Sequence, residues 1–187
     1  MCKSLCAVAT ICVLILCVLI LSGSAMAQAP LLQRGTQELG LSGVLDFENR
    51  GDTTLDLIGR YGYFMRDNLE VGGVASFSGN FDDAFRYGLG GFAEYHFPQW
   101  IPPHWPALVP YLGADVLLSF VDTDFGDDNA ALTFEPRIGL KWFVRDYFAV
   151  ESHLFFAIAT DDLYQNDRND LDPYDIGLRL GIRVYFR

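Results

Sequence analysis

Hydrophobic and polar residues alternate along most of the chain after position 36. In Ile176 and the C-terminal run "GLRLGIRVYFR" (177–187) that follows it, every second residue from Ile176 to Phe186 is apolar, and Arg179 and Arg183 lie between them. Side chains of a β-strand point alternately to its two faces, so this run predicts a strand with one apolar and one cationic face. The same period of two recurs in residues 39–47, 54–65, 69–77, 85–97, 111–120, 132–144 and 150–158, which predicts eight strands in total.

The number and length of these runs predict a closed barrel. Each run supplies roughly the 9–11 residues that a tilted strand needs to cross a bilayer. An even number of antiparallel strands can close on itself and leave no unpaired edge in lipid. We therefore predict an all-β fold, an eight-stranded antiparallel up-and-down transmembrane β-barrel over residues 36–187, preceded by a cleavable signal peptide.

The first 27 residues have the parts of a secretory signal peptide. Lys3 supplies a positive start, residues 7–21 form an apolar run, and Ala25-Met26-Ala27 fits a small-residue cleavage site. We predict cleavage after Ala27, directed by Ala25 and Ala27; an uncleaved membrane anchor is the alternative, but no basic stop-transfer cluster follows the run. All four cysteines lie in this segment, so the mature chain has no thiol. Residues 28–35 would then form a short periplasmic N-terminal segment.

Charged residues occupy the strand face opposite to the apolar one. Acids and bases are close to balance there, which suits paired charges in a confined interior. An eight-stranded barrel is just wide enough for side chains to fill, so we expect ion pairs to plug its lumen. The predicted lumen charge network consists of Asp56, Arg60, Glu70, Arg86, Glu94, Asp115, Glu135, Arg137, Lys141, Glu151, His153, Asp175, Arg179 and Arg183.

A soluble barrel with its apolar face inside is the alternative arrangement of the same strands. The balanced charges of the polar face argue against it, and so do connections that we expect to alternate in length. Aromatic residues near strand ends also favour a membrane barrel, because such barrels carry aromatic girdles at both interfaces. The expected girdle residues are Tyr61, Tyr63, Tyr95, Phe97, Trp142, Phe143 and Phe186.

Two similar segments predict tight turns at the periplasmic end of the barrel. "YFMRDNLEV" (63–71) and "WFVRDYFAV" (142–150) share an Arg-Asp pair between apolar residues. We expect Arg66-Asp67 and Arg145-Asp146 to form the turns, because Asp readily hydrogen-bonds to nearby turn backbone. The third connection at this end, "PQWIPPHWPA" (98–107), is longer and rich in proline.

The opposite end carries an excess of acid in "VDTDFGDDNA" (121–130) and "TDDLYQNDRNDLD" (160–172). We expect external loops there, where divalent cations bridge carboxylates and lipopolysaccharide. The spacing of the first group fits an EF-hand loop poorly, so no metal ligand is assigned. The predicted signal peptide holds one of the 13 bases and none of the 24 acids, so the mature chain has a formal charge of −12. This charge argues against nucleic acid as a partner.

Together these features resemble the small outer-membrane β-barrel family that includes the OmpA transmembrane domain and the OmpX-like and OmpW-like proteins. The resemblance rests on the alternating strands, the two Arg-Asp turns, "VPYLGADV" (109–116) and the terminal "RVYF" (183–186). It implies a Gram-negative-type outer membrane, with lipid and lipopolysaccharide around the barrel and the N-terminus in the periplasm. It also implies that the outer-membrane assembly machinery reads Val184 and Phe186, although Arg187 follows where the family usually ends on Phe.

The expected function is that of a non-enzymatic outer-membrane protein with a charge-plugged lumen and acidic surface loops, in a structural or surface-interaction role. A narrow, porin-like pore or conduit for small or apolar solutes is the alternative, because the inward glycines Gly88, Gly90, Gly177 and Gly181 could leave space. Glycine also lets a strongly curved barrel close.

A lipid-modifying outer-membrane enzyme is the third hypothesis. Glu151, Ser152 and His153 have the residue types of a hydrolytic triad. Strand alternation directs Ser152 into lipid and the other two into the lumen, so the three cannot converge. We assign no catalytic residue and no cofactor.

Overall fold

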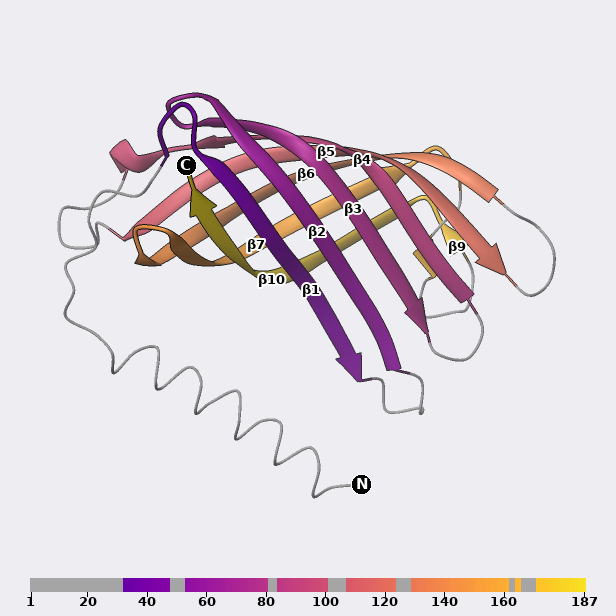
Figure 1. Cartoon of the computed structure of the whole chain (residues 1–187). Coiled ribbons are helices and arrows are strands. Elements are labelled where there is room, and N and C mark those ends of the chain that lie inside the picture. Colours follow the sequence, from indigo (N-terminus) through magenta and orange to yellow (C-terminus); the bar gives the residue numbers. More distant parts are fainter. Residues whose placement is uncertain are drawn as a thin grey trace, which may run out of the picture.

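The structure of the chain is a computed structural model, and it describes residues 32–47, 53–80, 84–100, 107–123, 129–161, 164–165 and 171–187. Eight of the ten strands in these ranges close into one antiparallel barrel (Figure 1). Around the barrel they follow the order β1 (Gln37–Phe47), β10 (Tyr174–Phe186), β7 (Phe148–Ala159), β6 (Asn129–Arg145), β5 (Leu108–Thr123), β4 (Ala84–His96), β3 (Leu69–Asn80) and β2 (Thr53–Arg66). The predicted eight-stranded up-and-down barrel is confirmed.

Three short elements lie in the connections. Strands β8 (Tyr164–Gln165) and β9 (Leu171–Asp172) pair with each other between β7 and β10, and the 3₁₀ helix η1 (Pro98–Trp100) follows β4. Within the described ranges, no helix has the length and apolar character needed to cross a membrane. The predicted signal peptide with Ala25 and Ala27 lies outside the described residues, and so do 28–31, 101–106, 124–128, 162–163 and 166–170 of the other predicted segments.

Side chains of the barrel strands alternate between a buried interior and an exposed exterior. On β7, His153 is 1% exposed, Leu154 is 56% exposed and Phe155 is 6% exposed. Apolar residues such as Ile176 on β10 and Leu89 on β4 cover the exterior, whereas most of the charged residues described within the barrel strands are buried inside. The alternative with an apolar interior is therefore wrong for this chain. An exposed apolar surface of this extent is typical of contact with lipid.

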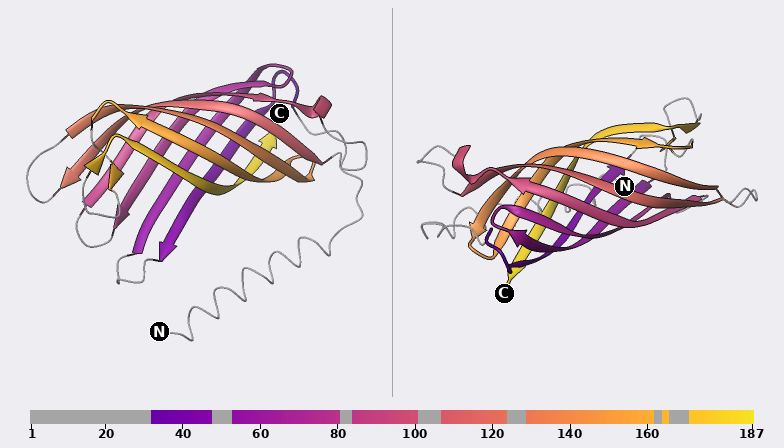
Figure 2. Two further views of the ribbon diagram at one scale, coloured as in Figure 1. Left: turned by 180° about the vertical axis from the view of Figure 1, so that it is seen from behind. Right: turned by 90° about the horizontal axis from the view of Figure 1, so that it is seen from above.

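The two ends of the barrel differ in their connections. The turn end carries the start of β1, the C-terminus and the connections 67–68, 97–107 and 146–147 (Figures 1 and 2). The loop end carries the connections 48–52, 81–83, 124–128 and 160–173. The connection 81–83 is short and the connection 97–107 is long, so the expected alternation in length does not hold throughout.

The two tight turns lie one residue later than predicted. Arg66 ends β2 and Arg145 ends β6, and the turns consist of Asp67-Asn68 and Asp146-Tyr147. Asn68 has a φ of 66°, in the left-handed region that Asn tolerates better than most residues. A bulge precedes each turn, between Phe64 and Arg66 and between Phe143 and Arg145, and these extra residues keep the arginines within the strands.

An apolar cluster fills the interior at the turn end. It consists of Leu32, Phe64, Val109, Phe143, Ala149 and Tyr185, with Ala107 packed against it. The segment before β1 is held there by backbone hydrogen bonds from Gly35 N to Phe64 O (3.0 Å) and from Asn68 N to Leu32 O (2.8 Å). Phe143 is only 1% exposed, so its expected place in an outer aromatic girdle is wrong. It shares a strand face with Lys141, and that face points inward.

The barrel closes where its first strand meets its last. β1 pairs with β10 over seven residues, from Gln37 opposite Phe186 to Gly43 opposite Leu180. In contrast, β1 pairs with β2 over eleven residues, and β10 pairs with β7 over eleven. The pairing of β1 with β10, which closes the barrel, is therefore shorter than the pairing of β1 with β2 and the pairing of β10 with β7.

Candidate functional site

A network of buried charges crosses the interior next to the apolar cluster. Lys141 Nζ donates to Glu38 Oε2 at 2.9 Å and to Glu94 Oε2 at 2.8 Å. Arg183 donates from Nη1 to Glu38 Oε1 at 2.7 Å and from Nη2 to Glu151 Oε1 at 2.6 Å. All five side chains are fully buried and come from β1, β4, β6, β7 and β10. The network therefore joins strands on opposite sides of the barrel.

A second group of ion pairs lies one layer closer to the loop end. Asp115 on β5 accepts hydrogen bonds from both Arg60 and Arg137, so one carboxylate lies between two guanidinium groups. Arg137 Nη2 also donates to Glu94 Oε1 at 2.7 Å, which connects this group to the first network. The ring of Phe92 lies 5.8 Å from the Arg60 guanidinium carbon and 5.6 Å from that of Arg137. Such aromatic contacts add a favourable interaction with each cation.

Arg179 forms the third group, toward the loop end. Its Nη1 donates to Glu135 Oε1 at 2.5 Å, and its Nε donates to Asp56 Oδ2 at 3.3 Å. The guanidinium carbon lies 3.5 Å from the centre of the Phe155 ring. Next to this group is a cavity of about 30 Å³, which is bordered in part by Ser76, Ser78, Arg86, Ser119, Thr133 and Arg179. A water needs roughly 10–15 Å³ of such volume, so the cavity has room for about two waters.

Small residues make room for these long side chains. A methyl group at Gly40 would overlap the guanidinium of Arg183, and one at Gly62 would overlap the carboxylate of Glu70. The inward glycines that were expected to leave space have close neighbours: a methyl group would meet Phe155 at Gly177, Glu151 and Ser42 at Gly181, Ser76 at Gly88, and the backbone of Val116 and Leu117 at Gly90. Glycine here accommodates neighbouring side chains and strands.

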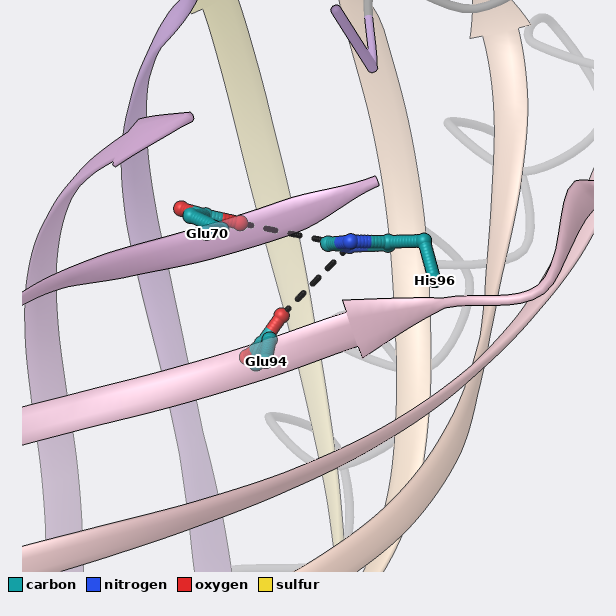
Figure 3. A group of neighbouring side chains, drawn as sticks. All are labelled: Glu70, Glu94 and His96. Carbon is teal, nitrogen blue, oxygen red and sulfur yellow. Dashed lines mark ion pairs between the residues drawn. The ribbon is translucent and has the colours of Figure 1, made fainter. Parts of the chain in front are cut away.

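Two histidines are buried among the charges. His96 Nε2 lies 3.6 Å from Glu94 Oε2 and 3.9 Å from Glu70 Oε2 (Figure 3). His153 Nδ1 lies 3.6 Å from Glu151 Oε1. All of these distances exceed the usual range for a hydrogen bond. Figure 3 shows the ring of His96 and the carboxylates of Glu70 and Glu94 directed toward one another from strands β3 and β4.

The structure places the predicted lumen residues as follows. Eleven are buried in the interior: Arg60, Glu70, Glu94, Asp115, Glu135, Arg137, Lys141, Glu151, His153, Arg179 and Arg183. Asp56, Arg86 and Asp175 are half-buried nearer the loop end. Each buried arginine, lysine and carboxylate of this set other than Glu70 forms one of the ion pairs described above. Glu70 also belongs to the assembly, through a distance of 3.7 Å from its Oε2 to Lys141 Nζ.

Sequence reasoning missed Glu38, which is fully buried and contacts both Lys141 and Arg183. Glu38 and Asp46 are an even number of residues apart in the first strand and so share its polar face. Beginning the predicted strand one residue earlier, at 38 instead of 39, would have included Glu38. Tyr111, whose hydroxyl donates to Glu151 Oε2 at 3.1 Å, is a second addition. Ser152 lies on the face of β7 opposite to Glu151 and His153, and these three residues do not converge.

The fold and the charged interior define a class of protein. A closed barrel of eight antiparallel strands, apolar outside and charged inside, is the fold of the small eight-stranded outer-membrane β-barrels. The chain is similar in structure to Neisserial surface protein A (NspA), at 17% sequence identity and a TM-score of 0.57 over 81% of this chain and 96% of that one.

Two further solved structures have the same fold. The N-terminal β-barrel domain of Pseudomonas aeruginosa OprF matches at 18% identity and a TM-score of 0.56, over 82% of this chain and 98% of that one. The outer membrane protein OprG from the same organism matches at 13% identity and a TM-score of 0.52, over 83% and 97%. At these identities the likeness shows the fold alone. No model of a known protein family and no curated protein sequence matches the chain.

Proposed function

We propose that the chain is a non-enzymatic integral protein of a Gram-negative-type outer membrane, with a lumen plugged by ion pairs. The observation that carries this proposal is the set of buried ion pairs that links Glu38 through Lys141, Glu94 and Arg137 to Asp115 across the barrel, with the Arg179–Glu135 pair as a separate group toward the loop end. Its role would be structural, with the loop end available for interactions at the cell surface.

Several observations support a closed lumen. An ion that crosses the barrel has to pass the apolar cluster at the turn end, which includes Phe64, Phe143 and Tyr185. It then has to separate buried pairs such as Lys141 and Glu38, which lie 2.9 Å apart. Breaking one buried ion pair costs about 3–5 kcal/mol, a large barrier to a permeating ion. The cavity of about 30 Å³ near Arg179 has room for only about two waters.

The outer surface supports the membrane location. Large apolar side chains are exposed along every barrel strand, for example Ile138 at 60% and Leu180 at 60%. On the last strand, Val184 and Phe186 face outward, in accord with the proposed recognition of this strand by the assembly machinery. We assign the turn end and the N-terminus to the periplasm and the acidic connections to the external surface, next to lipopolysaccharide and its divalent cations.

Single-channel conductance in a planar bilayer tests the plug. The refolded mature chain should be silent, whereas Arg137→Ala combined with Arg183→Ala should open discrete conductance steps, because both guanidinium groups beside Glu94 are removed. Arg34→Ala, an exposed change at the turn end, should remain silent. A heat-dependent gel shift confirms folding of each variant. A silent double variant that folds would contradict the plug.

A narrow conduit is the second candidate, and the hydroxyl-lined cavity near the loop end favours it. Ser76, Ser119 and Thr133 provide polar groups that a small solute could contact there. In this case the unmodified chain itself should give stable steps in the same bilayer experiment. Steps in the unmodified chain would therefore reject the plug and select the conduit.

A further inference from the structure

We propose that Glu70, Glu94 and His96 form a binding site for a divalent transition metal ion, with Zn²⁺ the best match to their chemistry (Figure 3). Each side chain offers one ligand atom, and the three atoms lie within 4.8 Å of one another. Imidazole nitrogen and carboxylate oxygen are ordinary zinc ligands. This site goes beyond the proposed plug and departs from the sequence analysis, which assigned no metal ligand.

Three polar atoms of this group are buried without hydrogen bonds. Both carboxylate oxygens of Glu70 and Nε2 of His96 have no hydrogen-bond partner among the described residues. Both side chains are completely inaccessible to solvent. Burying polar atoms in this way is costly, and native proteins pair nearly all of them. One cation bound between the two side chains would satisfy Glu70 and His96 at the same time.

The separations between the three side chains suit metal ligands better than hydrogen bonds. His96 Nε2 lies 3.6 Å from Glu94 Oε2 and 3.9 Å from Glu70 Oε2. Zinc bonds of about 2.0–2.2 Å at tetrahedral angles place neighbouring ligand atoms roughly 3.4 Å apart. The two separations from His96 Nε2 exceed this value by a few tenths of an ångström, and the ligand oxygens of Glu70 and Glu94 lie within 4.8 Å of each other.

The surroundings of His96 prepare Nε2 for a metal. Nδ1 of the ring lies 3.3 Å from the backbone oxygen of Asn68. A carbonyl oxygen only accepts hydrogen bonds, so Nδ1 carries the proton and donates it, and Nε2 of the neutral ring keeps its lone pair. The same Asn68 oxygen accepts from the His96 backbone N at 2.9 Å. Metal-binding histidines are commonly oriented by such a hydrogen bond to a carbonyl oxygen.

All three ligands come from one pair of neighbouring strands. Glu70 on β3 lies directly opposite Glu94 on β4, and His96 follows two residues later on the same face. The site therefore forms as soon as β3 and β4 pair. A metal can enter while the barrel folds, before Phe64 and Tyr111 enclose the ring of His96.

The described interior has one more buried carboxylate than buried base. Six buried carboxylates (Glu38, Glu70, Glu94, Asp115, Glu135 and Glu151) oppose five buried bases (Arg60, Arg137, Lys141, Arg179 and Arg183) in the described part of the chain. Lys141 competes with a metal, because its Nζ donates to Glu94 Oε2 at 2.8 Å and lies 3.7 Å from Glu70 Oε2. Removing the ammonium of Lys141 should therefore strengthen metal binding.

Folding the mature chain with Zn²⁺ or Co²⁺ tests the site. The chain is refolded in detergent micelles with each ion, desalted, and analysed for metal per folded chain and for the visible absorption of Co²⁺. We expect about one ion per chain and a tetrahedral Co²⁺ spectrum. Glu70→Gln and His96→Ala should each weaken metal binding at least about tenfold. Loss of a residue that only hydrogen-bonds to a metal ligand already lowers the affinity about tenfold or more. Lys141→Met should strengthen it at least about tenfold by removing a nearby positive charge.

His153→Ala is the matched control, because His153 is a second buried lumen histidine with a single carboxylate nearby. This variant should bind as much metal as the unmodified chain. Equal binding by folded His96→Ala would overturn the proposal, and so would the absence of metal from both the unmodified chain and Lys141→Met. The readout is bound metal, so its outcome is independent of whether the lumen conducts.

Discussion

Replacing Arg183 with methionine tests how strongly the interior ion pairs stabilise the barrel. The side chain is fully buried and donates to Glu38 at 2.7 Å and to Glu151 at 2.6 Å. Methionine keeps much of the apolar volume but removes both charge-assisted hydrogen bonds. Breaking a buried pair costs about 3–5 kcal/mol. Glu38 keeps Lys141 and Glu151 keeps Tyr111, so we expect the lower end of this range, about 3 kcal/mol.

Urea unfolding of the barrel from lipid vesicles, followed by tryptophan fluorescence, measures this effect. With a slope of about 2 kcal/mol/M, a loss of about 3 kcal/mol lowers the midpoint by about 1.5 M. Adding Glu151→Gln to Arg183→Met removes one uncompensated carboxylate and should recover part of the loss. Arg34→Met, at the exposed turn end, should leave the midpoint unchanged. An unchanged midpoint and slope in Arg183→Met would refute the reasoning.

Three further changes can be tested in the same assay. Gly40→Ala should destabilise the barrel by about 1–3 kcal/mol, because the added methyl group overlaps the guanidinium of Arg183. Gly59→Ala is the control: no atom lies near the position of its Cβ, so this variant should unfold like the unmodified chain. Phe64→Ala should lower the free energy of unfolding by about 3–5 kcal/mol, because it leaves a cavity in the apolar cluster at the turn end. A smaller loss of stability than in Gly40→Ala would contradict the core role of Phe64. Ile138→Arg should cost about 2–4 kcal/mol in vesicles, because this residue, 60% exposed near the middle of β6, faces lipid; full stability would argue against that orientation.

Strand alternation predicted the fold well because each barrel strand lies between two different environments. The parity of a residue decides whether it meets the exterior or the interior, and this rule placed Arg60, Lys141 and Leu154 on their observed faces. Residue type was a poorer guide. Phe143 was expected on the outside because it is aromatic, although its parity matches that of Lys141 and the structure buries it.

Pairing within the interior could not be predicted from the sequence. Arg60 contacts Asp115 across 55 positions, and Lys141 contacts Glu38 across 103. Such pairs depend on the tilt and stagger of the strands, which alternation leaves undetermined. The grouping of His96 with two carboxylates is partly visible in the sequence, because Glu94 and His96 are two residues apart on one strand and so share a face. The contribution of Glu70 depends on the register between β3 and β4.

The short seam between β1 and β10 has a consequence for how the barrel assembles. While the sheet is open, Glu38 and Arg183 lie on its two opposite edges, and neither can reach the other. Closure brings them to 2.7 Å and pairs seven residues of backbone at the same moment. A partly closed sheet in lipid would expose unpaired charges as well as unpaired backbone groups, both of which are costly there. Partly closed intermediates should therefore be scarce, and we expect insertion and closure to proceed as a single cooperative event.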